Sequence, residues 1–589
     1  MSDLLNQKKI IRRPEAQSLK TKKKDIIEDI IPLEKGAKVK VIPMGGLCEI
    51  GKNTWIFEAN DKIVLLDAGL GFPGDDMPGV NIVLPELTYL RDNHEKVAGM
   101  ILTHGHEDHI GGIVNMLRTI NVPIIYGPPL AIGLLEGKLK EHGLLSKTIL
   151  KRIEPRDTVT LKPFAFTWLR NNHSIPDSFS MVIQTPAGRI VHSGDFKFDH
   201  TPVDGELFDI AGLAEAGAKG VELLISDSTN AEKAGYTPSE RAVFPKIEEV
   251  FAKANKRIII TTFASQVHRV KQILEIAQKY GRKVAIFGRS MMNIALISRQ
   301  LGYMHFPDGL LIRGDEINNY PLNKIAVLTT GSQGEPLSAL TRIAKGTHRQ
   351  IQVIPGDTVV ISATPIPGNE RSVAATINAL FGRGAEVVYG REAGVHVSGH
   401  CSQEEQKLML SLVNPKFFMP AHGEYRMLVK HGKIGEEVCN LPPENVFIME
   451  NGDVLEVSQE GAAITGEVPA GVIMVENNGG DGNVNKELVQ ARNHLSSQGV
   501  VNVVLTFNGK KLISQPEVVF KGLVFPDGEK SLELKSKIID ALVKQYENKI
   551  EDQEKIESNV KKIVKEILLE IKHTPPVQVL VLKPELVSS

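Results

Sequence analysis

Cysteine, aromatic residues and long apolar runs are all scarce in this chain of 589 residues. It has three cysteines, too few and too scattered for a disulfide framework or a closed four-thiolate zinc site. No apolar run approaches the roughly 18 residues of a membrane span, and the first residues lack the hydrophobic region of a signal peptide. We therefore expect a cytoplasmic protein that has no membrane partner.

Excess charge of one sign is also missing, because 69 basic and 70 acidic side chains leave a net charge of −1. This balance argues against a protein that binds nucleic acid by phosphate contacts alone, since such proteins are usually basic. The length suggests about three to four globular domains. Basic clusters at residues 8–13 and 20–24 lie in a polar stretch, which predicts a flexible N-terminal extension over residues 1–35.

The most informative motif is Thr-His-Gly-His-Glu-Asp-His, which directly follows an apolar run at residues 97–102. Such a run predicts a buried strand, and open α/β sheets carry their sites in the loops at the carboxyl ends of strands. His104 and His106 can share one ion, while Asp108 and His109 can turn toward a second. The pattern favours a hydrolytic site for two metals; a mononuclear or structural site is the alternative.

Further histidines and carboxylates follow other apolar runs, as expected if several strands deliver ligands to one edge. These candidates are His173, Asp195 and His422. Asp67 ends an earlier run and is well placed to orient a ligand histidine by a hydrogen bond.

Taken in order, these motifs resemble those of the metallo-β-lactamase superfamily. The resemblance implies an α/β fold, the αββα sandwich, with two divalent ions per subunit, Zn²⁺ or Mn²⁺. It implies one ion on His104, His106 and His173, a second on Asp108, His109 and His422, Asp195 as the bridge, and Asp67 as a supporting residue outside the ligand set.

The stretch between Asp195 and His422 is too long for a loop, since structureless connections beyond about 15 residues are uncommon. Within it, apolar runs alternate with helical patterns, which predicts an inserted parallel α/β domain. The runs lie at residues 257–262, 283–287, 325–330 and 358–362. The insertion resembles the β-CASP group, and ribonuclease J in particular, through motifs at residues 225–230, 263–265, 330–336, 395–400 and 420–424.

Resemblance to the ribonuclease J family implies a metal-dependent ribonuclease with 5′–3′ exonuclease and endonuclease activities in rRNA processing and mRNA decay. Beside the catalytic carboxylates Asp108 and Asp195, it implies Asp227 and His400 as the pair that protonates the leaving oxygen. A buried structural pair is the alternative for these two residues. The residues implied for binding RNA and its 5′-monophosphate are Phe263, Ser265, His396, Val397, Ser398, Gly399 and His400.

The C-terminal part has a pattern of its own. Predicted strands at residues 500–506, 518–525 and 577–582 and amphipathic helices at 531–546 and 555–571 give a ββααβ unit. The family resemblance implies that this unit forms homodimers or homotetramers. The predicted domains are the extension 1–35, the metallo-β-lactamase domain in two parts at 36–229 and 391–475, the β-CASP domain at 230–390, a linker at 476–495 and the oligomerisation domain at 496–589.

Two other functions share these features. A small-molecule metallo-hydrolase acting on a thioester or lactam would use the same ligands but has no need for a large insertion. A non-catalytic scaffold in an RNA-degrading complex would not need an intact ligand set. The expected partner is single-stranded RNA with a 5′-monophosphate, with an RNA helicase or the ribosome as further candidates; DNA stays open because contacts to the 2′-hydroxyl cannot be read from these residues.

Overall fold

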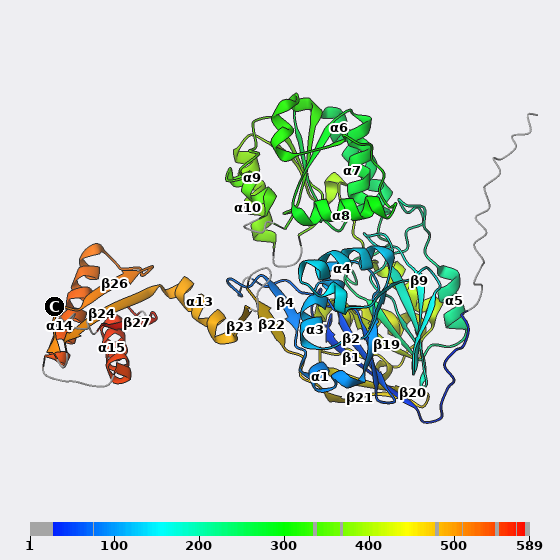
Figure 1. Cartoon of the computed structure of the whole chain (residues 1–589), viewed down its shortest axis with the longest axis horizontal. Coiled ribbons are helices and arrows are strands. Elements are labelled where there is room, and N and C mark those ends of the chain that lie inside the picture. The colour runs from blue at the N-terminus through cyan, green and yellow to red at the C-terminus, as the bar shows by residue number, and fades with distance from the viewer. Residues whose placement is uncertain are drawn as a thin grey trace, which may run out of the picture. The chain divides into compact units, whose positions relative to one another are not determined.

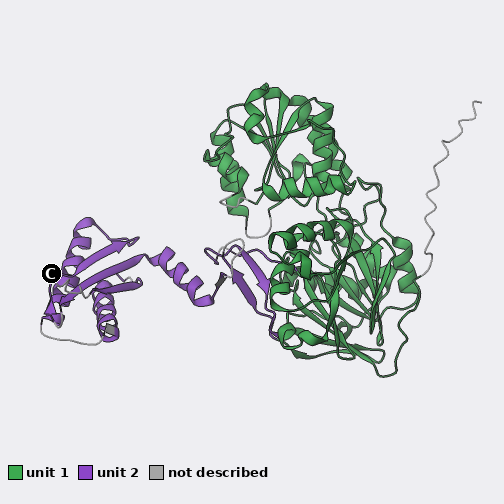
Figure 2. Cartoon of the chain, in the orientation of Figure 1, with its two compact units in different colours: residues 1–68, 89–365, 369–468 green, residues 69–88, 366–368, 469–589 purple. Residues whose placement is uncertain are grey.

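A computed structural model describes residues 27–74, 76–333, 338–365, 369–476, 482–508, 511–547, 553–572 and 574–582 (Figure 1). The chain forms two compact units, coloured separately in Figure 2. The first comprises residues 1–68, 89–365 and 369–468, and the second residues 69–88, 366–368 and 469–589. Over the described part of the chain, no helix combines the length and apolar character needed to cross a bilayer.

Two sheets face each other in the first unit. The eight-stranded sheet runs in the order β21 (Ala462–Glu467), β20 (Asp453–Ser458), β1 (Lys38–Gly45), β2 (Thr54–Ala59), β3 (Lys62–Leu66), β5 (Val97–Ile101), β6 (Ile125–Gly127) and β7 (Leu150–Arg152). The six-stranded sheet runs β19 (Phe417–Ala421), β12 (Leu223–Asp227), β11 (Gly188–His192), β10 (Phe179–Thr185), β9 (Phe164–Arg170) and β8 (Thr158–Leu161).

Alternate residues of a strand enter different cores, which explains why β10 is buried along its whole length. Met181 and Ile183 pack between the two sheets, whereas Val182 packs outward. The outward core contains residues of helices α5 (Ile210–Ala218), α11 (Gln403–Val413) and α12 (Tyr425–Cys439). On the other sheet, α4 (Pro129–Glu141) contacts β6 and β7. This is the predicted αββα sandwich.

The insertion forms a third sheet, whose six strands are all parallel. Its order is β15 (Leu311–Ile312), β14 (Lys283–Phe287), β16 (Ile325–Thr329), β13 (Ile258–Thr261), β17 (Thr358–Ile361) and β18 (Glu386–Val388). One face packs against α6 (Val243–Lys253), α7 (Val267–Lys279) and α8 (Arg289–Gln300), and the other against α9 (Ala339–Lys345) and α10 (Glu370–Gly382). The predicted parallel α/β insertion is confirmed.

The second unit contains the predicted ββααβ fold. Its elements are β24 (Val500–Asn508), β25 (Lys511–Leu512), β26 (Glu517–Lys521), α14 (Gly528–Tyr546), α15 (Gln553–Leu568) and β27 (Val577–Leu582). β24 lies between antiparallel β26 and parallel β27. The apolar positions Leu534, Ile538 and Leu542 of α14 are fully buried against this sheet, as their helical spacing predicts.

The predicted linker at residues 476–495 needs correction. From Asn483 onward the predicted linker is replaced by β23 (Asn483–Val484) and α13 (Lys486–Gln498), while residues 477–481 lie outside the described residues. β23 pairs with β22 (Val472–Val475), which also pairs with β4 (Ile82–Pro85). This small sheet joins segments far apart in sequence, a pairing that no local pattern announces.

The predicted flexible extension is wrong for its last residues. Ile27 is buried, its N–H donates to Glu215 Oε1 at 2.7 Å, and the N–H of Ile30 donates to Gln184 Oε1 at 2.7 Å. Residues 27–34 therefore pack against the sandwich as a strap. Residues 1–26, with both basic clusters, lie outside the described residues.

Candidate metal centre and active site

Strand topology brings the predicted ligands to one edge. β11, β12 and β19 are parallel neighbours, so Asp195 after β11, Asp227 at the end of β12 and His422 after β19 meet at their carboxyl ends. His104 follows β5 in the facing sheet. The structure thus assembles residues from both sheets, as predicted for a site at strand ends.

The first group of candidate ligand atoms consists of three imidazole nitrogens and one carboxylate oxygen. His106 Nδ1 lies 3.1 Å from His104 Nε2 and 3.0 Å from His173 Nε2. Asp195 Oδ2 lies 3.9 Å from His104 Nε2 and 3.7 Å from His173 Nε2. These four residues form one candidate set for an ion.

The second group shares Asp195 with the first. His109 Nε2 lies 3.2 Å from Asp195 Oδ2 and 3.7 Å from Asp108 Oδ2. His422 Nε2 lies 3.3 Å from Asp108 Oδ2 and 3.7 Å from Asp195 Oδ2. Asp195 alone belongs to both groups, which fits a bridging carboxylate.

The donor set fits divalent metal ions. A tetrahedral ion with ligands at about 2.0–2.2 Å separates those ligands by about 3.3–3.6 Å, close to the spacings found here. Imidazole lone pairs that converge at such spacings repel one another unless a cation or a proton lies between them. Histidine with carboxylate oxygen suits Zn²⁺ and Mn²⁺ alike.

Asp67 contacts two of the histidines, one directly and one through a threonine hydroxyl. His109 Nδ1 lies 2.7 Å from Asp67 Oδ2, which leaves Nε2 for the centre. The hydroxyl of Thr103 donates to Asp67 Oδ2 at 2.7 Å and lies 3.0 Å from His104 Nδ1, so it relays the same carboxylate to His104. Asp67 therefore lies beside both histidines and outside the candidate ligand groups.

Asp227 makes the same two kinds of contact with His400 and His422. His400 Nδ1 lies 2.7 Å from Asp227 Oδ2. The hydroxyl of Thr229 donates to Asp227 Oδ1 at 2.7 Å and lies 2.7 Å from His422 Nδ1. One carboxylate thus orients His400 directly and His422 through a threonine. Asp195, Asp227, His400 and His422 also form a third geometrically possible ligand group.

Two of these residues adopt a backbone conformation that is unusual for side-chain-bearing residues. Asp67 has φ of 58° and His422 has φ of 51°. Left-handed non-glycine residues cluster at functional sites, where the surrounding structure holds them in place. The N–H of His422 donates to Gly46 O at 2.7 Å, which helps to hold this turn.

The electrostatics distinguish the two groups. Burial lowers the pKa of His104 and His173 well below the usual range and that of His106 to about 4. Burial acts on His109 and His422 too, but neighbouring carboxylates, Asp195 foremost, outweigh it and raise both pKa values. The first group therefore offers neutral imidazoles, while the second holds protons that an ion must displace.

The predicted RNA-binding residues lie in two segments. Phe263 and Ser265 are half-buried in the turn between β13 and α7. Residues 396–400 reach one of the candidate ligands, since Gly399 O lies 2.8 Å from His173 Nδ1. Ala264 and Val397, one in each segment, pack against the same hydrophobic cluster.

Ser398 contacts Asn230, which lies three residues after Asp227. Its hydroxyl oxygen accepts from Asn230 Nδ2 at 2.9 Å and from the N–H of His400 at 3.1 Å. His396 Nδ1 instead lies 2.6 Å from a buried arginine nitrogen, Arg269 Nη1. Residues 334–336 of the predicted glycine-rich motif lie outside the described residues.

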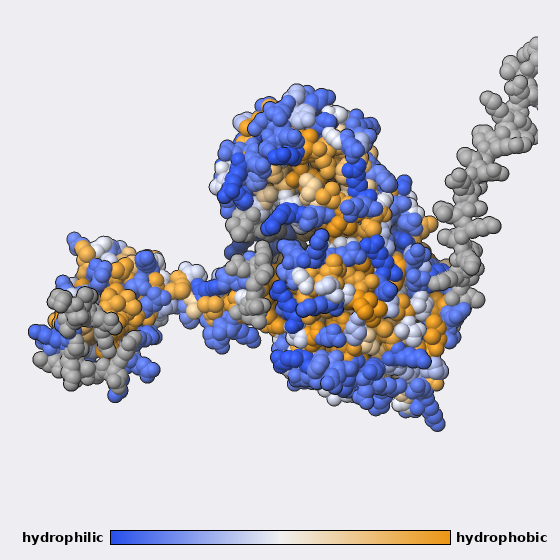
Figure 3. All heavy atoms as spheres, in the orientation of Figure 1, coloured by the Kyte–Doolittle hydropathy of each residue, from blue (hydrophilic) through white to orange (hydrophobic). Residues whose placement is uncertain are grey.

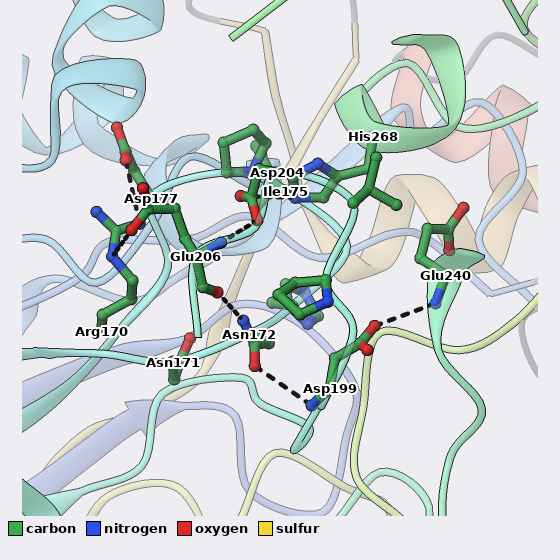
Figure 4. A pocket seen from close by; sticks show the side chains of 14 residues that line it. Arg170, Asn171, Asn172, Ile175, Asp177, Asp199, Asp204, Glu206, Glu240 and His268 are labelled. Carbon is green, nitrogen blue, oxygen red and sulfur yellow. Dashed lines mark hydrogen bonds and ion pairs between the residues drawn. The ribbon is translucent and has the colours of Figure 1, made fainter. Parts of the chain in front are cut away.

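A small polar cavity of about 20 Å³ borders the centre (Figure 4). His173 lines it, together with Arg170, Asn172, Asp199, Glu240 and His268 among others. It has room for about one water molecule and is far too small for a nucleotide.

Sequence reasoning named Asp67 and Asp227 but missed the threonines and the asparagine that lie beside the candidate ligands. Thr103 and Thr229 stand inside the motifs already singled out, so their positions were a usable signal. Asn53 was not: its Nδ2 lies 3.0 Å from His109 Nε2 and 3.3 Å from Asp108 O, and only the fold brings it there.

Comparison with protein-family models gives four matches along the chain. They are the metallo-beta-lactamase superfamily over residues 49–232, the ribonuclease J beta-CASP domain over 255–380, the Zn-dependent metallo-hydrolase RNA specificity domain over 384–438, and the ribonuclease J C-terminal domain over 487–583. Their order follows the order of folds in the structure.

Individual relatives agree with the models. Ribonuclease J of Synechocystis is 51% identical over 84% of this chain and 77% of its own length. Ribonuclease J 1 of Streptococcus pyogenes is 44% identical over 83% of this chain and 87% of its own. A crystal structure of an Enterococcus faecalis protein of unknown function shares the fold, with TM-score 0.51 and 15% identity over 72% of this chain and all of that one. With such identity over most of both lengths, and with a buried histidine–aspartate cluster in place, the chain belongs to the ribonuclease J family of metal-dependent RNA hydrolases.

Proposed function

We propose that this enzyme degrades RNA from a 5′-monophosphate end in the 5′–3′ direction and also cuts internally, in cytoplasmic RNA processing and decay. The convergence of two ligand groups on Asp195 is the observation that carries the proposal. All three cysteines are free, which supports a reducing compartment. Family membership leaves the small-molecule hydrolase and the non-catalytic scaffold without support.

Two divalent ions, Zn²⁺ or Mn²⁺, would be held by the two groups described above. When bound, such ions supply a water nucleophile of lowered pKa and neutralise charge on the phosphate in an in-line displacement. The match to a Zn-dependent metallo-hydrolase domain over residues 384–438 supports zinc, and the oxygen ligands are compatible with manganese.

The protein's own contribution to phosphodiester cleavage centres on His400. Asp227 Oδ2 accepts from His400 Nδ1, so the other ring nitrogen, Nε2, is available to carry and donate a proton. The His400 ring is stacked on that of His422 with a centroid distance of 5.2 Å, within reach of a phosphate held at the ligands. We assign His400 the protonation of the leaving oxygen and Asp227 its orientation.

The 5′-phosphate pocket is assigned to the turn at residues 263–265 and the segment 396–400. Backbone and hydroxyl donors in such turns suit a phosphate dianion. His400 and Gly399 connect this pocket to the ligands through Asp227 and His173. A short path from the pocket to the centre would admit one nucleotide, which gives stepwise release from the end.

Assembly and partners belong to the same proposal. Figure 3 shows hydrophobic residues on the visible face of the C-terminal ββααβ fold. Val524 is 80% exposed, and Leu580 and Leu582 on β27 are also exposed. We assign this fold to a homodimer or homotetramer contact, since exposed apolar clusters mark interaction sites. An RNA helicase or the ribosome would be a further partner.

A time course on one RNA carrying a 5′-monophosphate, a 5′-triphosphate or a 5′-hydroxyl tests the proposal, with added Zn²⁺ or Mn²⁺. Mononucleotides released first from the monophosphorylated RNA are expected. His106→Ala and Asp195→Asn should abolish cleavage but retain RNA binding. Cleavage that is equally fast from all three ends would overturn the end-anchored mode; full activity of Asp195→Asn would overturn the bridging role.

A further inference from the structure

Arg269 on α7 is completely buried, yet each of its five N–H donors has an acceptor. Nε and Nη2 donate to the two carboxylate oxygens of Glu240, both at 2.8 Å. Nη1 donates to Ser362 O at 2.9 Å and to His396 Nδ1 at 2.6 Å. Nη2 also donates to Val397 O at 3.3 Å. A guanidinium saturated in this way fixes the relative positions of three chain segments.

These contacts of Arg269 form a clamp between chain segments. One of the clamped segments continues into the proposed phosphate pocket. His396 and Val397 run directly into Ser398, Gly399 and His400. A Cβ at Gly399 would lie 2.8 Å from atoms of the His173 ring, so the segment approaches the ligand with no free space. A displacement at residue 397 would therefore be taken up along the segment that forms one wall of the proposed phosphate pocket.

The other side leads to the bridging carboxylate. The N–H of Glu240 donates to Asp199 Oδ2 at 3.1 Å, and Asp199 follows Asp195 by four residues in the sequence. Lys197, also fully buried, lies 3.6 Å from the same Asp199 oxygen. Glu240 is therefore anchored to the segment of Asp195, and Arg269 connects that segment to residues 396–400.

We propose that Arg269 is a positioning residue, which sets the distance between the metal centre and the 5′-phosphate pocket. The inference rests on the proposed function, because it explains what makes the end-anchored mode possible. Arginine is required here since a lysine keeps the charge beside Glu240 but loses the planar fork that also reaches His396 and Val397.

The chain provides a matched control. Arg257 pairs with Asp357 through Nε at 3.0 Å and Nη2 at 2.5 Å, and Nη2 also donates to Gln352 O at 2.8 Å. Both partners are buried. This pair lies before β13 and β17, at the amino ends of the same sheet, whereas Ser362 and Phe263 follow their carboxyl ends. Arg257→Lys thus loses a comparable two-point contact with a buried carboxylate, away from the site.

The experiment measures kcat/KM of full-length wild type, Arg269→Lys and Arg257→Lys on 5′-monophosphate and 5′-hydroxyl RNA of one sequence. Arg269→Lys should reduce the ratio of kcat/KM on 5′-monophosphate RNA to that on 5′-hydroxyl RNA by about tenfold. This is the effect expected from the loss of one to two hydrogen bonds to residues 396–397. Its bound metal and its cleavage of a circular RNA should be nearly unchanged. Arg257→Lys should lower the melting temperature and leave the ratio as in wild type.

An unchanged ratio in folded Arg269→Lys, or an equal fall in Arg257→Lys, would overturn the positioning role. If Arg269→Lys does not fold, Glu240→Gln serves instead, because it keeps the packing but turns one acceptor of the clamp into a donor; an unchanged ratio there likewise rejects the idea. A wild type without any preference for the monophosphate overturns the proposed function itself, which separates the two failures.

Discussion

Two threonines help to orient the proposed ligand histidines. Thr103 and Thr229 each link a buried aspartate to a proposed ligand histidine by hydrogen bonds, while the same aspartate contacts a second histidine directly. Asp67 serves His104 and His109, and Asp227 serves His422 and His400. Outer partners of this kind set the tautomer and orientation of ligands, so they affect affinity without touching the ion.

Thr229→Val tests this relay, because valine has the same shape but no hydroxyl. His422 Nδ1 would lose its acceptor, and we expect metal affinity to fall by about 10–100-fold. Thr229→Ser keeps the hydroxyl and should stay within about threefold of wild type. Competition with a chelator of known affinity measures both. Equal affinities for the valine and serine variants would contradict the relay.

Acid–base behaviour should separate the two ligand groups. His109 and His422 have raised pKa values, so they hold protons near neutral pH in the metal-free protein, whereas His104, His106 and His173 do not. Binding at Asp108, His109 and His422 must then release protons, and its affinity must increase with pH. Binding at the first group should depend little on pH above about 4, the pKa of His106 in the metal-free protein.

Calorimetric metal titrations in buffers of different ionisation heat measure this release. Two steps are expected at pH 7, of which only one depends on the buffer. With His422→Ala the buffer-dependent step should disappear. A titration in which neither step depends on the buffer would show that the second group is already neutral.

At the scale of elements, strand ends were predictable and strand partners were not. Two strands were predicted from apolar runs, one at residues 97–102 and one before His422. Buried strands are apolar throughout, so the polar candidate ligands at their ends stand out in the sequence. Asn53 and Arg269 gave no such signal, since each reaches the site only through packing across the fold.

The strap at residues 27–34 was missed for a similar reason. Its contacts include hydrogen bonds from its backbone to Glu215 and Gln184 and the burial of one apolar side chain, Ile27, and none of these has a sequence period. The ion pair of Asp29 with Arg189, at 2.5 Å, adds an exposed contact of little weight.

Removing residues 1–34 should therefore destabilise the sandwich, whereas removing residues 1–26 deletes none of these contacts. Burial of one isoleucine gives about 2 kcal/mol, and the buried hydrogen bonds add about 1 kcal/mol, so a loss of about 3 kcal/mol is expected. Thermal melts of the two truncations measure the difference. Equal midpoints would mean that the strap contributes nothing to stability.

For the whole molecule, the division into two units differs from the predicted domain order. β4 lies early in the chain, between elements of the sandwich, yet its strand partner is β22, and Val83 packs with Met474, Val484 and Val489. Residues 69–88 therefore belong with the C-terminal part. A linear reading of domains cannot find this, because the contact joins residues almost four hundred positions apart.

Two truncations separate this pairing from the C-terminal fold. Ending the chain at residue 499 removes β24 through β27 but keeps β22, β23 and α13, whereas ending it at residue 468 removes these as well. The shorter chain leaves the buried side chains of Val80, Val83 and Leu84 without their cover. At about 1.5–3 kcal/mol for each such side chain, we expect a lower melting temperature and aggregation of the 1–468 chain only.

Light scattering coupled to size exclusion measures mass on the same samples. If the ββααβ fold holds the subunits together, the full chain should be a dimer or tetramer and the 1–499 chain a monomer that still binds metal and cleaves RNA, because all ligand residues precede residue 499. A 1–499 chain that keeps the mass of the assembly would place the subunit contact elsewhere. A 1–468 chain as stable as the 1–499 chain would instead mean that β22 and α13 do not support β4, since Val83 and Leu84 would then tolerate solvent at no cost.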